Sequence, residues 1–297
     1  MNKILKNRVL KDLRPNGIWQ LTDKIKSLLR LHISRLPTRK VSENETRYPE
    51  CPASMKAFLI KFFTRHYFQT QNSMVTYMTS EDFLNIIRSK RLRILDIGSG
   101  PAVTPLAITD MLSRILKNLK ESGEWPKRQI VNVDCVLNDT SGICLGTAQR
   151  MLTDYSKVCR SNNNGINIRR IISIQKAFPE NYNQLRRIQF NIGTYDIVIF
   201  SYIAHALIED KGFQRLIKGL RDIEKLCNRH GRIFILQDKF QDTLMKRISK
   251  AIGTSIHREE STQEVYPNRN TNETYTYSYY SCLYDPTQKA QGLSNVA

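Results

Sequence analysis

The chain has 297 residues, of which 40% are apolar and 25% are charged. This composition supplies one substantial core or two small ones and lies outside the range of disordered chains. The 46 Lys and Arg exceed the 27 Asp and Glu, and the resulting formal charge of +19 predicts an anionic partner. No run approaches the ~18 apolar residues of a membrane span, and charges interrupt the start MNKILKNRVLKDLR too often for a secretory signal. We therefore expect a cytoplasmic protein without a membrane partner, with mitochondrial targeting as the alternative.

The first third of the chain is the most basic part. Residues 1–93 hold 19 Lys and Arg against 7 Asp and Glu, a contribution of +12. Apolar residues recur every three or four positions over residues 18–33, with basic residues between them, and predict an amphipathic helix that ends before Pro37. A second helix, expected over residues 52–69, mixes aromatic with basic side chains. We therefore expect a basic helical region over residues 1–90.

The composition of this region fits more than one role. Clustered Lys and Arg indicate RNA as its partner. A solvated helix face or an organellar targeting helix would have similar charges. The aromatic side chains suit a packed helix as well as stacking on bases.

The six cysteines are scattered, without a C-x-x-C pair and without a Cys/His pair at zinc-ligand spacing. We expect no metal site and no disulfide framework. In apolar surroundings such as VDCVL, a cysteine is ordinarily a small buried hydrophobic residue.

The most informative run is RLRILDIGSGPAVTPLAI, residues 91–108. Its first part predicts a short apolar strand that carries Asp96, and its last part predicts an apolar helix. Between them, Gly98 and Gly100 permit a tight turn in which no side chain separates a ligand from the backbone. The N–H groups at the start of the following helix then point at that ligand.

The form of this loop decides between two ligand classes. A dinucleotide-binding loop has the pattern G-x-G-x-x-G, and Val103 stands where its third glycine would be. An acid before the first glycine instead resembles the first motif of the class I S-adenosylmethionine-dependent methyltransferases. The resemblance implies S-adenosylmethionine as cofactor, with Asp96, Gly98 and Gly100 at its methionine part.

Further segments resemble that family in the required order. QIVNVDCVLNDTSGICLGTAQRML reads as a second strand and helix, and the family has an acid there that binds the ribose hydroxyls. Asp139, followed by Ser141, has the family's spacing, whereas Asp134 inside the strand is the alternative. The third strand, INIRRIISIQ, ends at Gln175, which stands where the family often has an acidic or polar residue beside the adenine.

The later elements complete the expected fold. Tyr195 and Asp196 precede a fourth strand, IVIF, and RIFILQD is a fifth. The alternating tyrosines of TNETYTYSYYSCLY suit the antiparallel hairpin that closes the family's sheet. We expect an α/β fold with a doubly wound, mostly parallel, seven-stranded sheet over residues 91–290, preceded by the basic helical extension.

The end of the fourth strand faces the transferred methyl group in this family. Ser201, Tyr202 and His205 are therefore the candidates for contact with the acceptor, and His205 has a pKa suited to a base. Ser201 is also expected at the cofactor. The Asn/Asp-Pro-Pro-aromatic run of base-amine methyltransferases and the Pro-Cys of cytosine-C5 enzymes are absent from this strand.

Three functions remain open at this point. YDIVIFSYIAHAL followed by GRIFILQDKFQDTLMKRISKAI is similar to the small-ribosomal-subunit methyltransferase-like proteins. Together with the charge, this favours a methyltransferase acting on ribosomal or other structured RNA. The alternatives are a small-molecule N- or O-methyltransferase and a non-catalytic RNA-binding assembly factor that retains the cofactor fold.

Overall fold

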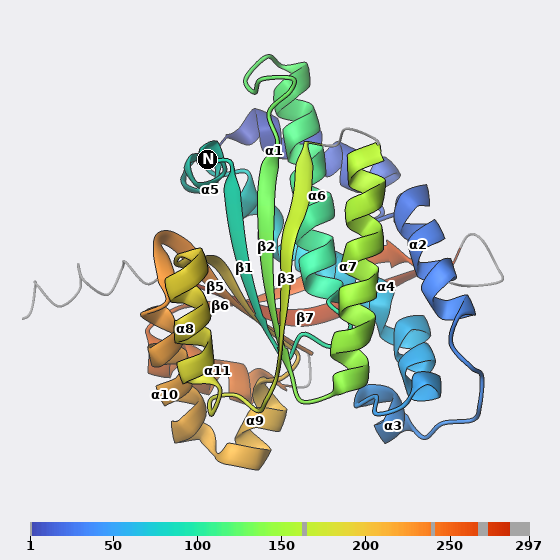
Figure 1. Cartoon of the computed structure of the whole chain (residues 1–297), viewed down its shortest axis with the longest axis vertical. Coiled ribbons are helices and arrows are strands. Elements are labelled where there is room, and N and C mark those ends of the chain that lie inside the picture. The colour runs from blue at the N-terminus through green and yellow to red at the C-terminus, as the bar shows by residue number, and fades with distance from the viewer. Residues whose placement is uncertain (1, 162–164, 239–240, 267–272, 286–297) are drawn as a thin grey trace, which may run out of the picture.

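The computed structural model describes residues 2–161, 165–238, 241–266 and 273–285 (Figure 1). Within these residues, five α-helices and one short 3-10 helix precede the first strand. Their bounds are α1 (Lys3–Leu13), η1 (Pro15–Gly17), α2 (Asp23–Ser34), α3 (Glu43–Arg47), α4 (Pro52–Met78) and α5 (Glu81–Arg88). Helix α2 starts later than its apolar pattern predicts, because the Thr22 side chain caps it by accepting from the Ile25 N–H. Helix α4 runs beyond its expected end at Gln69.

The rest of the chain forms a seven-stranded sheet in the order β3-β2-β1-β4-β5-β7-β6. The strands are β1 (Arg91–Ile97), β2 (Val131–Asp139), β3 (Ile166–Gln175), β4 (Tyr195–Ser201), β5 (Cys227–Asp238), β6 (Ile256–Glu264) and β7 (Thr274–Tyr284). The five strands β1 to β5 are parallel, and β7 is antiparallel to both β5 and β6. The predicted doubly wound, mostly parallel sheet and its closing hairpin are confirmed.

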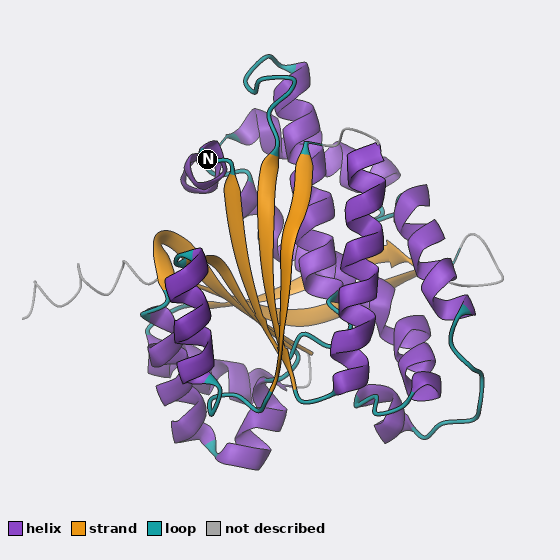
Figure 2. Cartoon of the chain, viewed as in Figure 1, coloured by secondary structure: helices purple, strands orange, loops and turns teal. Residues whose placement is uncertain are grey.

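Helices cover both faces of the sheet (Figure 2). Those after β1 are α6 (Val103–Glu121), α7 (Gly142–Ser161), α8 (Tyr182–Ile192), α9 (Ala204–Lys211), α10 (Phe213–Glu224) and α11 (Asp242–Ile252). One hydrophobic cluster joins α6 and α7 to one face, and a second joins α8 to α11 to the other. Alternate residues of β1 enter different clusters, Ile94 the first and Leu95 the second, so both faces of the central strand are buried against apolar side chains.

The N-terminal helices belong to the first of these clusters. Leu5, Val9 and Leu13 of α1 are buried in the same core as the residues of α6. The backbone of Trp19 continues the sheet at its far edge, where the Trp19 N–H donates to the Thr262 carbonyl at 3.1 Å. Helices α1, α2, α4 and α5 therefore pack as a layer of the same core as the α/β sheet.

Candidate active site

The glycine loop lies between the end of β1 and the start of α6. Gly98 (φ +70°) and Gly100 (φ +50°) both adopt left-handed backbone conformations that favour glycine. The N–H groups of Gly98 and Ser99 donate to the Asn138 carbonyl at 2.8 and 2.9 Å. These bonds fix the loop against the end of β2, at the carboxyl edge of the parallel strands where such sheets bind their ligands.

The two glycines serve different purposes. A Cβ on Gly98 would lie 2.2 Å from Cδ1 of Ile203, so the space beside Gly98 is filled by packing from the chain itself. A Cβ on Gly100 would meet nothing within 4 Å. The open approach to the loop backbone is therefore at Gly100.

Asp96 is the most unusual polar residue of this edge. Its side chain is 1% exposed, and neither carboxylate oxygen has a hydrogen-bond partner among the described residues. Burial, together with the nearby negative charge of Asp139, raises the pKa of Asp96 well above its usual value. Burial of an ionised carboxylate without hydrogen-bond donors destabilises the folded state, because the group loses its hydration and forms no compensating interaction.

The structure distinguishes the two candidate acids of β2. Asp139 lies at the end of the strand, where its carboxylate accepts from the N–H groups of Gly100 and Ser141, each at 2.8 Å. Asp134 is fully buried within the strand and ion-paired with Arg91 and Arg169, each at 2.9 Å. Asp134 therefore has a structural role, whereas Asp139 adjoins the open side of the loop.

Gln175 and Ser201 lie at the same edge. The Gln175 amide donates to the Thr140 carbonyl at 3.2 Å, which places it beside the turn that follows Asp139. The Ser201 hydroxyl lies 3.1 Å from the Thr104 hydroxyl in the first turn of α6. The edge thus brings together residues from the ends of β1, β2, β3 and β4.

Tyr202 connects this edge to helix α4. Its φ of +61° is unusual for a residue with a side chain. The phenol ring stacks on the imidazole of His66, with ring centroids 3.8 Å apart and planes 12° apart, and its hydroxyl donates to the side-chain amide oxygen of Gln69. His205, the third candidate, is in α9, and its side chain lies outside the described part of the structure.

The sequence alone did not indicate His66, Gln69 and Arg65 as site residues. Burial and the positive charge of Arg65 lower the pKa of His66 well below its usual value, so the imidazole is neutral at pH 7. Arg65 is ion-paired with Asp238 at the end of β5 and lies 5.2 Å from the ring centroid of Tyr277. The mixture of basic and aromatic residues in α4 indicated a possible binding role for this helix. It does not indicate which strand ends the helix packs beside.

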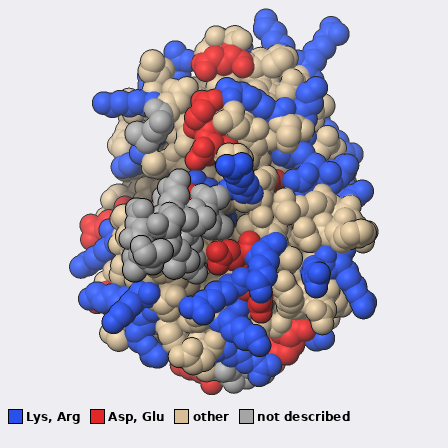
Figure 3. Space-filling model, turned by 90° about the vertical axis from the view of Figure 1, so that its left-hand side faces the viewer, with Lys and Arg blue, Asp and Glu red and all other residues tan. Residues whose placement is uncertain are grey.

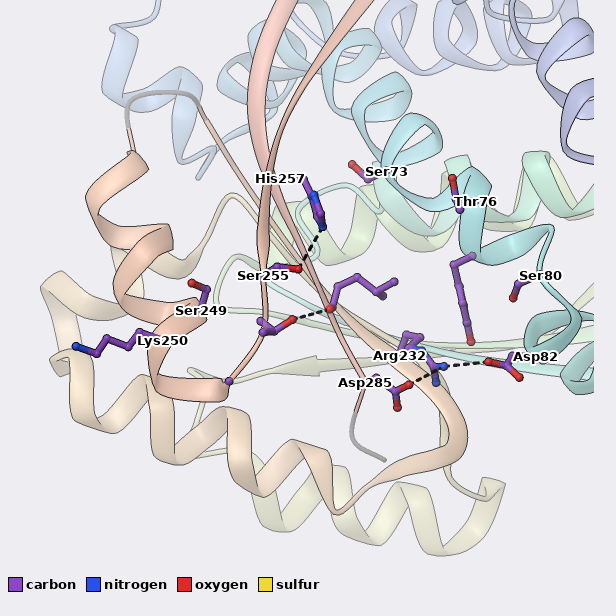
Figure 4. A pocket seen from close by; sticks show the side chains of 14 residues that line it. Ser73, Thr76, Ser80, Asp82, Arg232, Ser249, Lys250, Ser255, His257 and Asp285 are labelled. Atoms are coloured by element: carbon purple, nitrogen blue, oxygen red, sulfur yellow. Dashed lines mark hydrogen bonds and ion pairs between the residues drawn. The ribbon is translucent and has the colours of Figure 1, made fainter. Parts of the chain in front are cut away.

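A hollow of about 780 Å³ lies away from this edge (Figure 4). It is bordered by the C-terminal half of α4, the amino end of β5 and the turn between α11 and β6. Its Arg232 is held by Asp82 at 3.1 Å and by Asp285 at 2.8 Å, which neutralise the guanidinium. None of the residues predicted to bind the cofactor lines this hollow.

Two further properties bear on the chemistry. Among the described residues, no group of His, Cys, Asp and Glu side chains is placed to hold a metal ion. No helix in that same part of the chain is long and apolar enough to cross a membrane.

The strand order with a single antiparallel strand is that of the class I methyltransferase sheet. The chain has the class I S-adenosylmethionine-dependent methyltransferase fold. No protein-family model matches the sequence, and no curated protein matches it.

Solved structures resemble this methyltransferase fold at low identity. A candidate RNA methyltransferase of Pyrococcus horikoshii is 11% identical, covers 86% of this chain and 97% of its own, and has a TM-score of 0.41. A precorrin-6y C5,15-methyltransferase of Geobacter metallireducens is 13% identical over 70% and 88% of the two chains, with a TM-score of 0.39. A ribosomal protein L11 methylase of Lactobacillus delbrueckii subsp. bulgaricus is 14% identical over 68% and 74%, with a TM-score of 0.34.

Proposed function

We propose that the chain is an S-adenosylmethionine-dependent methyltransferase that acts on RNA. The observation that carries the cofactor assignment is the buried carboxylate of Asp96, whose two oxygens have no partner among the residues that the structure describes, at the edge where the glycine loop opens. A ligand that brings a cation or several donors to this point would compensate the desolvation of the acid. The ammonium group of S-adenosylmethionine has that chemistry.

The residues present fit the rest of the cofactor. Asp139, at the end of β2, is suited to accept from ribose hydroxyls, and Gln175 to hydrogen-bond the adenine. Gly100 leaves the loop backbone accessible to the methionine part, since nothing stands within 4 Å of its Cβ position. When bound, the cofactor supplies a methyl group on a positively charged sulfur.

The acceptor would enter beside Ser201 and Tyr202. The stacked rings of Tyr202 and His66 present aromatic surface at this point, and such surface suits a planar acceptor such as a nucleobase. Because the imidazole of His66 is neutral at pH 7, it can take the proton that a nitrogen or oxygen acceptor releases on methylation. Positioning of the acceptor supplies much of the remaining catalysis.

The charge supports RNA as the acceptor molecule. A net charge of +19 attracts a polyanion, whereas a small amine gains nothing from it. Figure 3 shows Lys and Arg side chains over much of one side of the molecule, with smaller groups of Asp and Glu between them.

The proposal is tested with radiolabelled methyl transfer. Purified protein is incubated with methyl-labelled S-adenosylmethionine and either total RNA or a panel of small amines and phenols. We expect label in RNA that ribonuclease releases, and much less label with the Asp96→Asn variant at a cofactor concentration that does not saturate it. Label in an amine or phenol alone would establish the small-molecule alternative, and cofactor binding without transfer to any of them would establish the assembly factor.

A further inference from the structure

Among the described strands, β3 forms one edge of the sheet and pairs with β2 on one side only. Helix α7 packs against it on one face. On the other face, Ile172 and Ile174 of β3 share a hydrophobic cluster with Leu185 and Ile192 of α8. The edge of β3 therefore lies open between two helices, as the front of Figure 1 shows.

The segment that builds this edge holds nearly all the excess charge outside the N-terminal region. Residues 142–195 contain eight Lys and Arg against two Asp and Glu, an excess of +6. The whole chain beyond residue 93 carries +7. The charge of the α/β part is thus concentrated around β3.

Some of these cations already have partners within the protein. Arg169, the extra residue at the register shift of β3, pairs with Asp134 at 2.9 Å. Arg160 of α7 donates to the Asn167 side chain at 2.9 Å, and Lys157 pairs with Asp154 at 3.1 Å. These three contribute little to an external ligand.

Four other cations are exposed and have neither an ion pair nor a side-chain hydrogen bond among the described residues, whereas Arg150 donates to the Thr147 hydroxyl at 3.2 Å. These four are Arg170, Lys176, Arg186 and Arg187. Arg170 is two residues before Ile172, so the alternation of the strand places it on the sheet face that α8 covers. Lys176 directly follows Gln175, at the edge where the cofactor residues gather.

Helix α8 presents its basic residues outward. Its buried residues, Leu185 and Ile192, fix the opposite face toward solvent. That face carries Arg186, Arg187 and Phe190, and Phe190 is 89% exposed. The exposed ring of Phe190 therefore does not pack against the core, and it lies one helical turn after Arg186. An exposed aromatic ring beside a cation is the combination that binds single-stranded nucleic acid by stacking and charge.

We infer that RNA docks along the open edge of β3 and the outer face of α8, an inference that rests on the proposed RNA substrate. Arg170, Lys176, Arg186 and Arg187 contact phosphates, and Phe190 stacks on a base. The RNA-binding surface formed by these residues ends at Lys176, beside Gln175 and the predicted adenine position. Docking there brings the RNA strand to the sheet edge that carries Ser201 and Tyr202, the candidate residues for contact with the methyl acceptor.

The test compares two triple variants of the full chain with equal loss of charge. The first is Arg170→Gln/Arg186→Gln/Arg187→Gln. The matched control is Lys3→Gln/Arg8→Gln/Lys11→Gln on α1, in the region that the sequence favours for RNA binding. Affinity for a fluorescently labelled single-stranded RNA is measured over a range of salt, and cofactor affinity is measured by calorimetry.

We expect the first variant to lose at least tenfold in RNA affinity at low salt. Its slope of log affinity against log salt should fall by about 2, since each phosphate contact to a single strand contributes roughly 0.7. The α1 variant should stay within about twofold of the unmodified chain. Phe190→Ala should weaken binding severalfold at every salt concentration without changing the slope, because stacking releases no counterions.

The outcomes separate this inference from the proposed function. A larger loss in the α1 variant, or equal RNA affinity in all variants, would overturn docking on β3 while leaving the cofactor site intact. Failure of the unmodified chain to bind S-adenosylmethionine would instead overturn the proposed function. Unchanged cofactor affinity in both triple variants shows that the α/β fold is preserved.

Discussion

Replacement of Asp96 by Asn should make the cofactor-free protein more stable and the cofactor affinity lower. Asp96 is 1% exposed and neither carboxylate oxygen has a partner in the described part of the chain, so its ionised form loses hydration without compensation. Removing the charge at constant shape should therefore raise the free energy of unfolding by about 1 to 3 kcal/mol at neutral pH. For a chain of this size, each kcal/mol corresponds to a Tm increase of roughly 2 °C.

The pH dependence of this effect has a definite sign. Burial raises the pKa of Asp96 in the folded state, so folding is opposed once the unfolded acid ionises, near pH 4. The Tm difference between Asp96→Asn and the unmodified chain should therefore be absent at acid pH and grow as pH rises toward the folded pKa. Differential scanning fluorimetry over a pH series measures it.

Calorimetry supplies the second half of this test. Loss of a charge-assisted interaction should weaken S-adenosylmethionine binding by about 1.5 to 3 kcal/mol, roughly 10- to 150-fold. Asp134→Asn is the matched control. It leaves Arg91 and Arg169 without their buried partner and should lower the Tm. An Asp96→Asn protein that melts below the unmodified chain and binds the cofactor normally would refute the reasoning.

Three further substitutions have distinct expected effects. Gly98→Val should lower the Tm and cofactor affinity together, because its side chain would collide with Ile203 and strain a left-handed backbone; unchanged calorimetric affinity would show that the loop tolerates it. Asp139→Ala should weaken cofactor binding by about 1 to 3 kcal/mol, and a larger loss in Asp134→Ala would reverse the ribose assignment. His66→Phe should retain cofactor affinity but lower kcat by roughly 100-fold. If His66 is the base, the rate of the unmodified chain should rise with pH below pH 6.5, because the lowered pKa of His66 places its titration there. The His66→Phe variant should lack this rise, and an unchanged pH–rate profile in the variant would exclude His66 as the base.

Much of the candidate cofactor-binding edge could be predicted because its residues are close in sequence or lie at the ends of strands. The run from Asp96 to Gly100 is a local strand, turn and helix signal, and the carboxyl ends of parallel strands meet at one edge. Asp139, Gln175 and Ser201 follow from that topology once each strand is recognised. The structure places all of them at this edge.

The contribution of helix α4 could not be predicted in the same way. The apolar pattern of a helix identifies its buried face but not the element that covers it. The hydrogen bond between Tyr202 and Gln69 joins residues 133 positions apart, and its formation depends on how the whole N-terminal layer packs. His66 was therefore visible in the sequence as one basic residue among aromatics, with no indication of its stacking partner.

The charge of a sequence segment also differs from the charge of the surface that it forms. Several N-terminal cations are neutralised by acids far along the chain: Lys26 pairs with Glu264 at 2.9 Å, and Arg65 pairs with Asp238. The +12 of residues 1–93 is therefore partly neutralised within the fold, and the exposed cations without ion pairs in the described structure include Lys3, Arg8 and Lys11 of α1 as well as the four around β3. Because cations already paired with acids bind phosphate less strongly, the comparison of the α1 and β3 triple variants tests the unpaired cations of the two surfaces directly.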